Sequence, residues 1–293
     1  MTTTTRPREG LVEAPPSSDP EAGSPPTRER GRPRLAPGRA LGVGVVGLWL
    51  SVIVLLPLAA LTVHSLDEGV AGFWDAVTAP VAVAAIWTTL LVSAGVALVN
   101  AVMGTLIAWV LVRDDFPGKR SVDALIDLPF ALPTIVASIV LLSLYGPNSP
   151  IGVHLNATRW GLAIALAFVT LPFVVRSVQP VLIDMERDVE EAAASLGASG
   201  FTTFRRIILP TIAPAILAGS ALSFARALGE FGSVILISAN LIGKTEVSSA
   251  YMLKLIESDD TVGAAGVATL LLIVAIVVLV ILDSLQRVAA RRD

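Results

Sequence analysis

The chain lacks cysteine and has few of the other residues from which catalytic or metal sites are built. Among its 293 residues only two are histidines, His64 and His154, and they stand far apart in the sequence. The absence of thiols excludes disulfides, thiolate nucleophiles and thiolate–metal sites. Two isolated histidines do not make the cluster of ligands that a metal site needs. We therefore expect no metal site and no catalytic residue in this chain.

Charge is also scarce, and apolar sequence takes its place. Only 15% of the residues are charged, against about 25% in a typical soluble domain. The net charge of −3 gives no sign of a nucleic-acid partner. Hydrophobic residues make up 54% of the chain, and the mean hydropathy is +0.76. Because they gather in runs that approach or exceed the ~18–20 residues of a membrane-crossing helix, we predict an all-α, polytopic membrane protein.

The runs predict a tail followed by six membrane-spanning helices. Residues 1–38 are rich in Thr, Pro, Ser, Glu and Arg, and we predict a disordered tail because they cannot bury enough apolar surface to fold. Residues 39–293 then form one six-helix domain. Kinks are expected at Pro129 and Pro133 in the third span and at Pro172 in the fourth, where proline frees backbone groups. The predicted spans cover residues 41–65, 84–112, 122–145, 160–181, 211–238 and 264–286.

Lysine and arginine are distributed unevenly between the connections, which predicts the orientation of the chain. The segment before the first span, two of the connections and the C-terminal end are rich in these residues. The other connections hold only Arg159, Lys244 and Lys254. Positive residues favour the cytoplasmic side of a membrane. Both termini and the connection between spans four and five are therefore predicted to be cytoplasmic, in a multi-pass protein of the cell membrane.

That connection contains a polar stretch with the pattern of two short helices. Gly197 permits the left-handed conformation that commonly ends a helix. Ser199 or Thr202 could cap the second helix, and Pro210 would begin the fifth span. The first helix gathers its small apolar residues on one face: Val189, Ala192, Ala193 and Leu196. Small residues allow close approach, so docking into a protein groove is favoured over contact with lipid, for which bulky and basic residues would be expected.

Seven residues in this stretch match the EAA signature of ATP-binding-cassette importer permeases. The signature is Glu-Ala-Ala, three residues, Gly, nine residues, Ile, one residue and Leu-Pro. In this sequence it falls on Glu191, Ala192, Ala193, Gly197, Ile207, Leu209 and Pro210. The resemblance implies the type I, MetI-like permease fold. It also implies that a loop at about 185–210 inserts into a cleft on a separate ATPase, which would use ATP and Mg while this chain binds no cofactor.

Further segments resemble the oxyanion permeases of the sulfate and molybdate groups. FARALGEFGSVILISANLIGKTEVSS (224–249), LYGPNSPIG (144–152) and LPFVVRSVQPVL (171–182) look like the T subunit of sulfate/thiosulfate permeases. The resemblance covers roughly residues 40–290. It implies four partners: an ATPase dimer, a second permease, an extracytoplasmic sulfate-binding protein and sulfate itself. Thiosulfate, molybdate and tungstate remain open as alternative substrates.

IGKT at residues 242–245 resembles the end of a phosphate-binding loop, but the rest of that motif is missing. The full loop needs a glycine five residues before Gly243, where this chain has Ser238. The predicted topology also places this segment outside the cell, away from cytoplasmic ATP. Nucleotide must therefore be bound by a partner.

Arg226 and Glu230 are charged residues within the predicted fifth span, where charge is costly and marks a candidate functional site. Their spacing of four places them on one helical face. A rise of 1.5 Å per residue places Arg226 roughly 22 Å along a helix that starts at residue 211. Two interpretations stay open: Arg226 meets an anion or a gate, or the two residues form a structural ion pair. Other candidates for the path are Ser223, Ser233 and Thr134, with Ser220, Ser138, Asn100 and Thr105.

Two other classes of protein are compatible with the composition. A secondary transporter driven by an ion gradient would need buried acids for the coupling ion, and the spans offer chiefly Glu230. A membrane anchor without a path would not need kinked spans that carry serine. Neither class explains the EAA signature.

Overall fold

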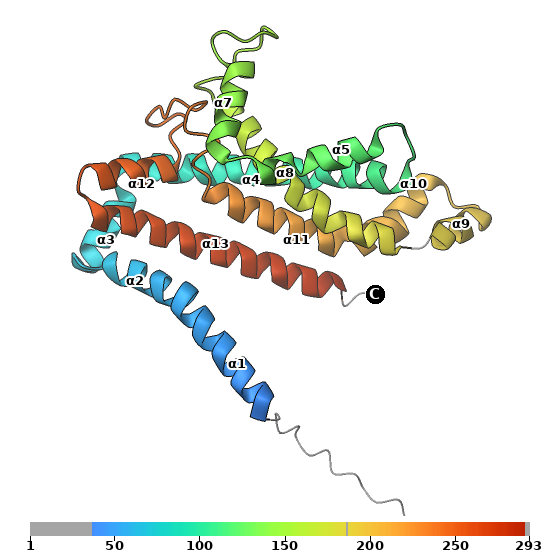
Figure 1. Cartoon of the computed structure of the whole chain (residues 1–293), viewed down its shortest axis with the longest axis horizontal. Coiled ribbons are helices and arrows are strands. Elements are labelled where there is room, and N and C mark those ends of the chain that lie inside the picture. The colour runs from blue at the N-terminus through green and yellow to red at the C-terminus, as the bar shows by residue number, and fades with distance from the viewer. Residues whose placement is uncertain (1–36, 186, 291–293) are drawn as a thin grey trace, which may run out of the picture. The chain divides into compact units, whose positions relative to one another are not determined.

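The computed structural model describes residues 37–185 and 187–290. Within these residues every regular element is a helix (Figure 1), so the predicted all-α class is confirmed for this part of the chain. The predicted tail, apart from its last two residues, lies outside the described residues. The chain divides into two units, Met1–Ser51 and Val52–Asp293. In the first unit the described elements are α1 (Pro37–Leu50) and the first residue of a π-helical turn that starts at Ser51, and the other helices begin in the second unit.

Five helices in the described part of the chain are long and apolar enough to cross a membrane. They correspond to the first, second, fourth, fifth and sixth predicted spans. These helices cover Leu41–His64, Pro80–Arg113, Arg159–Asp184, Gly200–Leu228 and Thr261–Arg287. The first consists of α1, a π-helical turn (Ser51–Leu55) and α2 (Leu56–His64); the others contain α4 (Pro80–Arg113), α8 (Arg159–Asp184), α11 (Leu209–Leu228) and α13 (Thr261–Ala290). Two short helices, α3 (Gly69–Thr78) and α12 (Ser248–Glu257), join neighbouring spans.

The predicted third span is wrong as a continuous helix. It is divided into α5 (Lys119–Ile126), α6 (Leu128–Ala131) and α7 (Thr134–Tyr145). Leu132 and Pro133 are extended, with ψ of 135° and 132°, because proline disfavours helical backbone in the residue before it and offers no N–H. The kink expected at Pro133 is thus a break. In contrast, α8 continues through Pro172 and Pro180 without ending.

The fifth predicted span is shifted toward the N-terminus. Helical backbone begins with α10 (Gly200–Thr203), passes through a π-helical turn (Phe204–Ile208) and continues into α11, so the second short helix is not separate from the span. At its other end α11 stops at Leu228, ten residues earlier than predicted. The chain from 229 to 247 contains turns, and Ala239 and Asn240 adopt positive φ there. The glycines at 229 and 232, poor helix formers, lie where the helix fails to continue.

Three long helices, α4, α8 and α11, pack side by side in the second unit. Figure 1 shows them together with α13, while α5 and α7 lie beyond α8. The approach is closest at glycine: a Cβ on Gly219 of α11 would lie 2.7 Å from the Cα of Val174 on α8. A Cβ on Gly104 of α4 would lie 2.8 Å from the Cβ of the same valine. Small residues let membrane helices approach in this way. The buried cluster around this contact includes Ala108, Val174, Val175, Val178, Ile208 and Ile212.

We predict that Gly219→Ala destabilises the protein by about 1–3 kcal/mol, because the added methyl group meets backbone that cannot move aside. The matched control is Gly95→Ala on α4, where a Cβ meets nothing within 4 Å. That variant should stay within about 0.5 kcal/mol of the parent. Thermal unfolding in detergent, followed by tryptophan fluorescence, measures both. Equal unfolding midpoints for the two variants would contradict the proposed close contact.

Candidate functional site

The elbow segment, residues 187–210, consists of two helices joined by a turn at Gly197. The first, α9 (Arg187–Ser195), ends where Gly197 adopts φ +81°, and two amides of the turn donate back to carbonyls of α9. The hydroxyl of Ser199 then accepts a hydrogen bond from the amide of Thr202 at 3.3 Å and caps α10. The predicted left-handed glycine and the predicted Ser199 cap are confirmed. The turn therefore has a defined geometry, since few residues other than glycine adopt this φ without strain.

The elbow segment is attached to the end of α4 by charge and by aromatic contact. Arg113 Nη2 lies 2.6 Å from Glu190 Oε1, and the side chain of Arg113 is only 10% exposed. The guanidinium carbon of Arg113 is 5.8 Å from the ring centroid of Trp109. Trp109 meets Phe204 edge to face, with centroids 5.7 Å apart. A displacement of α9 would therefore bear directly on the last turn of α4.

The elbow segment presents exposed apolar side chains beside its acidic residues. Leu196 is 89% exposed and Phe201 73% exposed, whereas Ala193 is buried. The predicted apolar face of α9 is thus divided, because Ala193 packs within this chain and Leu196 is accessible to another. Of the seven signature residues, Glu191, Ala192, Gly197, Leu209 and Pro210 are exposed, Ile207 is half-buried and Ala193 is buried. Exposed apolar residues on either side of the turn at Gly197 are suited to a protein partner.

The predicted Arg226–Glu230 ion pair forms, but only one of its partners lies in the helix. Arg226 is in the last turn of α11, and Glu230 follows two residues after the helix ends, where its carboxylate contacts the guanidinium. The prediction that both lie within one span is wrong, because α11 ends before Glu230. Glu230 is 2% exposed, and its Oε1 accepts a hydrogen bond from the amide of Ser233 at 2.8 Å. The carboxylate thus supports the first turn of residues 229–247, which we call the irregular segment. The side chain of Arg226 is 36% exposed.

Thr134 and Ser233, two other predicted path residues, flank the same close contact. A Cβ on Gly232 would lie 2.1 Å from Thr134 Oγ1, so the irregular segment lies directly against the start of α7. Ser138, one turn further along α7, accepts a hydrogen bond from the amide of Leu236 at 3.2 Å. The hydroxyl of Ser233 is buried without a hydrogen-bond partner among the described residues. These contacts bring the predicted residues of two predicted spans together.

Ser223 belongs to a second, fully buried polar contact. The side-chain amide of Asn100 on α4 donates to Thr170 Oγ1 on α8 at 2.8 Å and lies 3.3 Å from Ser223 Oγ on α11. All three side chains are at most 2% exposed. Such contacts hold membrane helices together because hydrocarbon offers no alternative partner. Asn100 and Ser223 were predicted as candidates, whereas Thr170 was missed: nothing in its sequence position separates it from other threonines.

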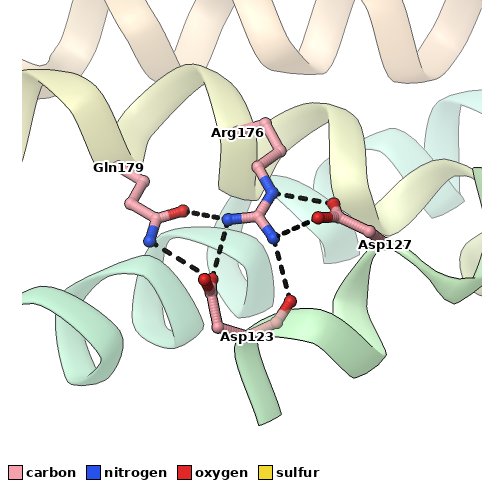
Figure 2. Close-up of polar contacts among 4 residues, drawn as sticks. All are labelled: Asp123, Asp127, Arg176 and Gln179. Carbon is pink, nitrogen blue, oxygen red and sulfur yellow. Dashed lines mark hydrogen bonds and ion pairs between the residues drawn. The ribbon is translucent and has the colours of Figure 1, made fainter. Parts of the chain in front are cut away.

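A third polar cluster joins the broken third span to α8, as Figure 2 shows. Arg176 Nε and Nη2 donate to the two carboxylate oxygens of Asp127 at 2.8 and 2.6 Å. Its Nη1 donates to Asp123 Oδ1 at 2.7 Å and to Gln179 Oε1, and its Nη2 donates to the carbonyl of Asp123. The sequence predicts snorkelling or local pairing for the two aspartates, whereas the structure pairs them with an arginine about 50 positions away on another helix. Asp123 lies outside the five long helices, and its hydrogen bond with Arg176 lowers the pKa of the Asp123 carboxyl.

Glu246 and Lys254 form a further ion pair that sequence reasoning missed. Glu246 is 1% exposed and contacts the ammonium group of Lys254 on α12. Beside it, Thr245 Oγ1 donates to the carbonyl of Ser238 at 2.6 Å. The IGKT segment therefore ends in residues that hold the irregular segment together. Glu246 lies in a polar stretch, GKTEVSS, and its partner is eight residues further along, so spacing gives no signal for this pair.

Long apolar helices, an elbow segment at one end of them and charge pairs at their interruptions are features of a multi-pass membrane transport protein. The chain belongs to the family of binding-protein-dependent transport system inner membrane components. The sequence model of that family matches residues 100–292.

Curated relatives and solved structures agree with this membership. The sulfate transport system permease protein CysT of Synechocystis sp. is 44% identical, over 82% of this chain and 86% of the relative. The protein of the same name from Salmonella typhimurium is 42% identical, over 88% and 96%. A crystal structure of a bacterial alginate ABC transporter superposes with a TM-score of 0.71 at 18% identity, covering 85% of this chain and 93% of that one. The MetNI methionine ABC transporter gives 0.56 at 16% identity, covering 71% and 95%. The structural matches confirm the type I importer permease fold.

The unequal burial of Arg226 and Glu230 predicts unequal effects of removing each charge. Arg226→Gln leaves a buried carboxylate without its cation and should cost about 3 kcal/mol or more. Glu230→Gln leaves a partly exposed guanidinium, and its amide oxygen still accepts from Ser233, so the cost should be about 1 kcal/mol. The exposed pair Arg287–Asp283 supplies a control, since Arg287→Gln should change stability by less than about 0.5 kcal/mol. Thermal unfolding in detergent measures all three, and a larger loss for Glu230→Gln would overturn this interpretation.

Proposed function

We propose that this chain is one permease subunit of an ATP-driven importer and, together with a second permease, encloses the path by which sulfate enters the cell. An extracytoplasmic sulfate-binding protein delivers the anion. A separate ATPase dimer, which uses ATP and Mg, moves the permeases between outward-open and inward-open states. The chain itself carries out no chemical step.

Relatives named as sulfate permeases carry the substrate assignment. Five of them are 41–44% identical to this chain over 82–88% of its length. The aligned region covers most of the chain, and with it the helices that would line a path. Sulfate needs hydrogen-bond donors and no proton transfer, and Ser223, Ser233, Thr134 and Arg226 are the proposed donors to the path or its gate. Thiosulfate, molybdate and tungstate are chemically close oxyanions, so they belong in the test.

Coupling to the ATPase is assigned to the elbow segment by its geometry and its position. Leu196 and Phe201 are exposed at its tip, while Arg113 and Glu190 fix its base to α4. Within the second unit the elbow segment, the α4–α5 connection and the C-terminal end of α13 lie at the same end of the helices (Figure 1). These are the parts of the chain in which arginine and lysine gather, which favours a cytoplasmic position for that end and for both termini.

Uptake of labelled sulfate into vesicles tests the substrate assignment. Vesicles that contain this chain, its second permease, the ATPase and the binding protein should accumulate sulfate only when ATP is present. Unlabelled sulfate should compete more strongly than molybdate or tungstate. Uptake driven by an ion gradient without ATP would contradict the proposed class, and stronger competition by molybdate would contradict the proposed substrate.

Gly197→Pro tests the elbow segment. Proline requires φ near −65°, whereas Gly197 has φ +81°, so the substitution should destroy the turn while the long helices still insert. We expect ATP-dependent sulfate uptake to fall by at least about tenfold, with the ATPase still hydrolysing nucleotide. Gly200→Ala is the matched control, because a Cβ there meets nothing within 4 Å and φ is ordinary. Normal uptake by Gly197→Pro would count against coupling through this segment.

A further inference from the structure

Every N–H group of Arg176 is used in holding one short segment of the chain. A guanidinium has five N–H donors, and here they meet Asp127, Asp123 and Gln179 through five hydrogen bonds. Gln179 also donates to Asp123 Oδ1 at 3.3 Å, so it bridges the cation and one of its anions. The two aspartates belong to the broken third span, and Arg176 and Gln179 belong to α8. We call these four residues the Arg176 clamp (Figure 2).

The segment that the clamp holds, residues 119–131, makes few other contacts: Ile126 packs against the core cluster and Phe130 meets Phe173. No side chain of α5 is buried, and Pro129 is the one buried residue of α6. The segment is bounded by Gly118 at φ +87° on one side and by the extended Leu132–Pro133 pair on the other. Elements with few buried apolar side chains are those that open at low free energy. The clamp is therefore the principal polar attachment of residues 119–131, which have non-helical backbone at both ends.

Burial distinguishes this cluster from the ion pairs of Glu230 and Glu246. The side chains of Arg176, Asp123 and Asp127 are 29%, 40% and 48% exposed, whereas those of Glu230 and Glu246 are each 1% exposed. An isolated pair that water reaches contributes about 1 kcal/mol or less, and a bidentate cluster such as this one contributes more, but water still solvates its charges when it opens. Breaking a buried pair costs about 3–5 kcal/mol. Of these clusters, the Arg176 clamp is the one that can open and close during a transport cycle.

The clamp also lies next in the chain to the attachment of the elbow segment. Arg113, which contacts Glu190 of α9, is the last residue of α4, and α5 begins six residues later. Between them Phe116 packs against the same core cluster as Phe204. A displacement of α9 therefore has a contiguous route, through Arg113 and the 114–118 connection, to the segment that the clamp holds.

We propose that the Arg176 clamp is a conformational latch, which fastens residues 119–131 to α8 in one state of the transport cycle and releases them in another. Arg176 is a positioning residue in this proposal and is not assigned contact with the transported anion. The proposal rests on the ATP-driven cycle set out above. A permanent structural clamp is the alternative, and it predicts a fixed distance between α6 and α8.

Thiol bridging tests the latch, and the chain is suited to it because it has no cysteine of its own. Phe130 on α6 and Phe173 on α8 lie one turn from the clamp, with ring centroids 5.2 Å apart. The double variant Phe130→Cys/Phe173→Cys is assembled with cysteine-free partner subunits and joined by a short bifunctional thiosulfonate. We expect the bridged complex to lose ATP-dependent sulfate uptake and to regain it when a reductant cleaves the bridge. Undiminished uptake by the bridged complex would overturn the latch.

The unbridged double variant separates this proposal from the proposed function. ATP-dependent uptake by the unbridged variant supports the function whatever the bridge does. If that variant transports poorly, the yield of bridging itself gives the answer. The latch predicts that the yield differs about fivefold between nucleotide-free and ATP-trapped complexes, a ratio that corresponds to about 1 kcal/mol. The matched control is Trp109→Cys/Phe204→Cys, whose rings meet with the same edge-to-face geometry against a buried core cluster and whose yield should not change. Equal yields at 130/173 in both states contradict the latch.

Discussion

Hydrocarbon offers no hydrogen bonds to a polypeptide backbone, and the architecture of this protein follows from that constraint. A helix satisfies its own amides and carbonyls, so five long apolar helices form with few polar side chains. Wherever the helix is interrupted, side chains must take over. At the end of α11 the carboxylate of Glu230 accepts from Ser233, and the hydroxyl of Ser138 accepts from Leu236. Among the described residues, the two buried glutamates, Glu230 and Glu246, both lie in the interruption that follows α11, whereas the buried polar residues of the long helices are neutral.

The interruptions are also where sequence reasoning succeeded least. Hydropathy located five of the long helices, and the glycine turn and its serine cap followed from backbone conformation alone. The third predicted span failed because its apolar residues are continuous while its backbone is not: Pro133 breaks a run that hydropathy scores as unbroken. The fifth span failed at its end for a similar reason, because VILIS after Gly232 is apolar and yet folds as turns. Apolar composition predicts that a segment lies in the membrane region, but it does not predict that the segment is one continuous helix.

The polar contacts show the same division between what spacing can and cannot predict. The Arg226–Glu230 pair is local, with a separation of four residues, and could be read from the sequence. The contact of Asn100 with Thr170 and that of Arg113 with Glu190 join residues about 70 positions apart, so their partners depend on how the helices pack. The pairing of Arg176 with two aspartates on another element has the same origin. Charge in an apolar sequence identifies one member of such a contact, and only the fold identifies the other.

Together these contacts describe a mechanical arrangement. The core of α4, α8 and α11 is tightly packed, with close glycine contacts and a buried amide. The elbow segment projects from one end of this core and is fastened to α4. The α5–α6 segment, residues 119–131, is fastened to α8 through a cluster that water reaches. A displacement of the elbow segment would therefore act on two parts of the chain. One is the tightly packed core of α4, α8 and α11, and the other is the more weakly attached segment 119–131.

The central claim is that the elbow segment is the part of this chain on which an ATPase acts. A photoreactive amino acid at Leu196, the most exposed large apolar residue of that segment, tests it directly in an assembled, transporting complex. The account predicts an ATPase adduct from Leu196 and none from Ile273, an exposed residue in the middle of α13. A complex that transports sulfate while Leu196 yields no ATPase adduct would contradict the account.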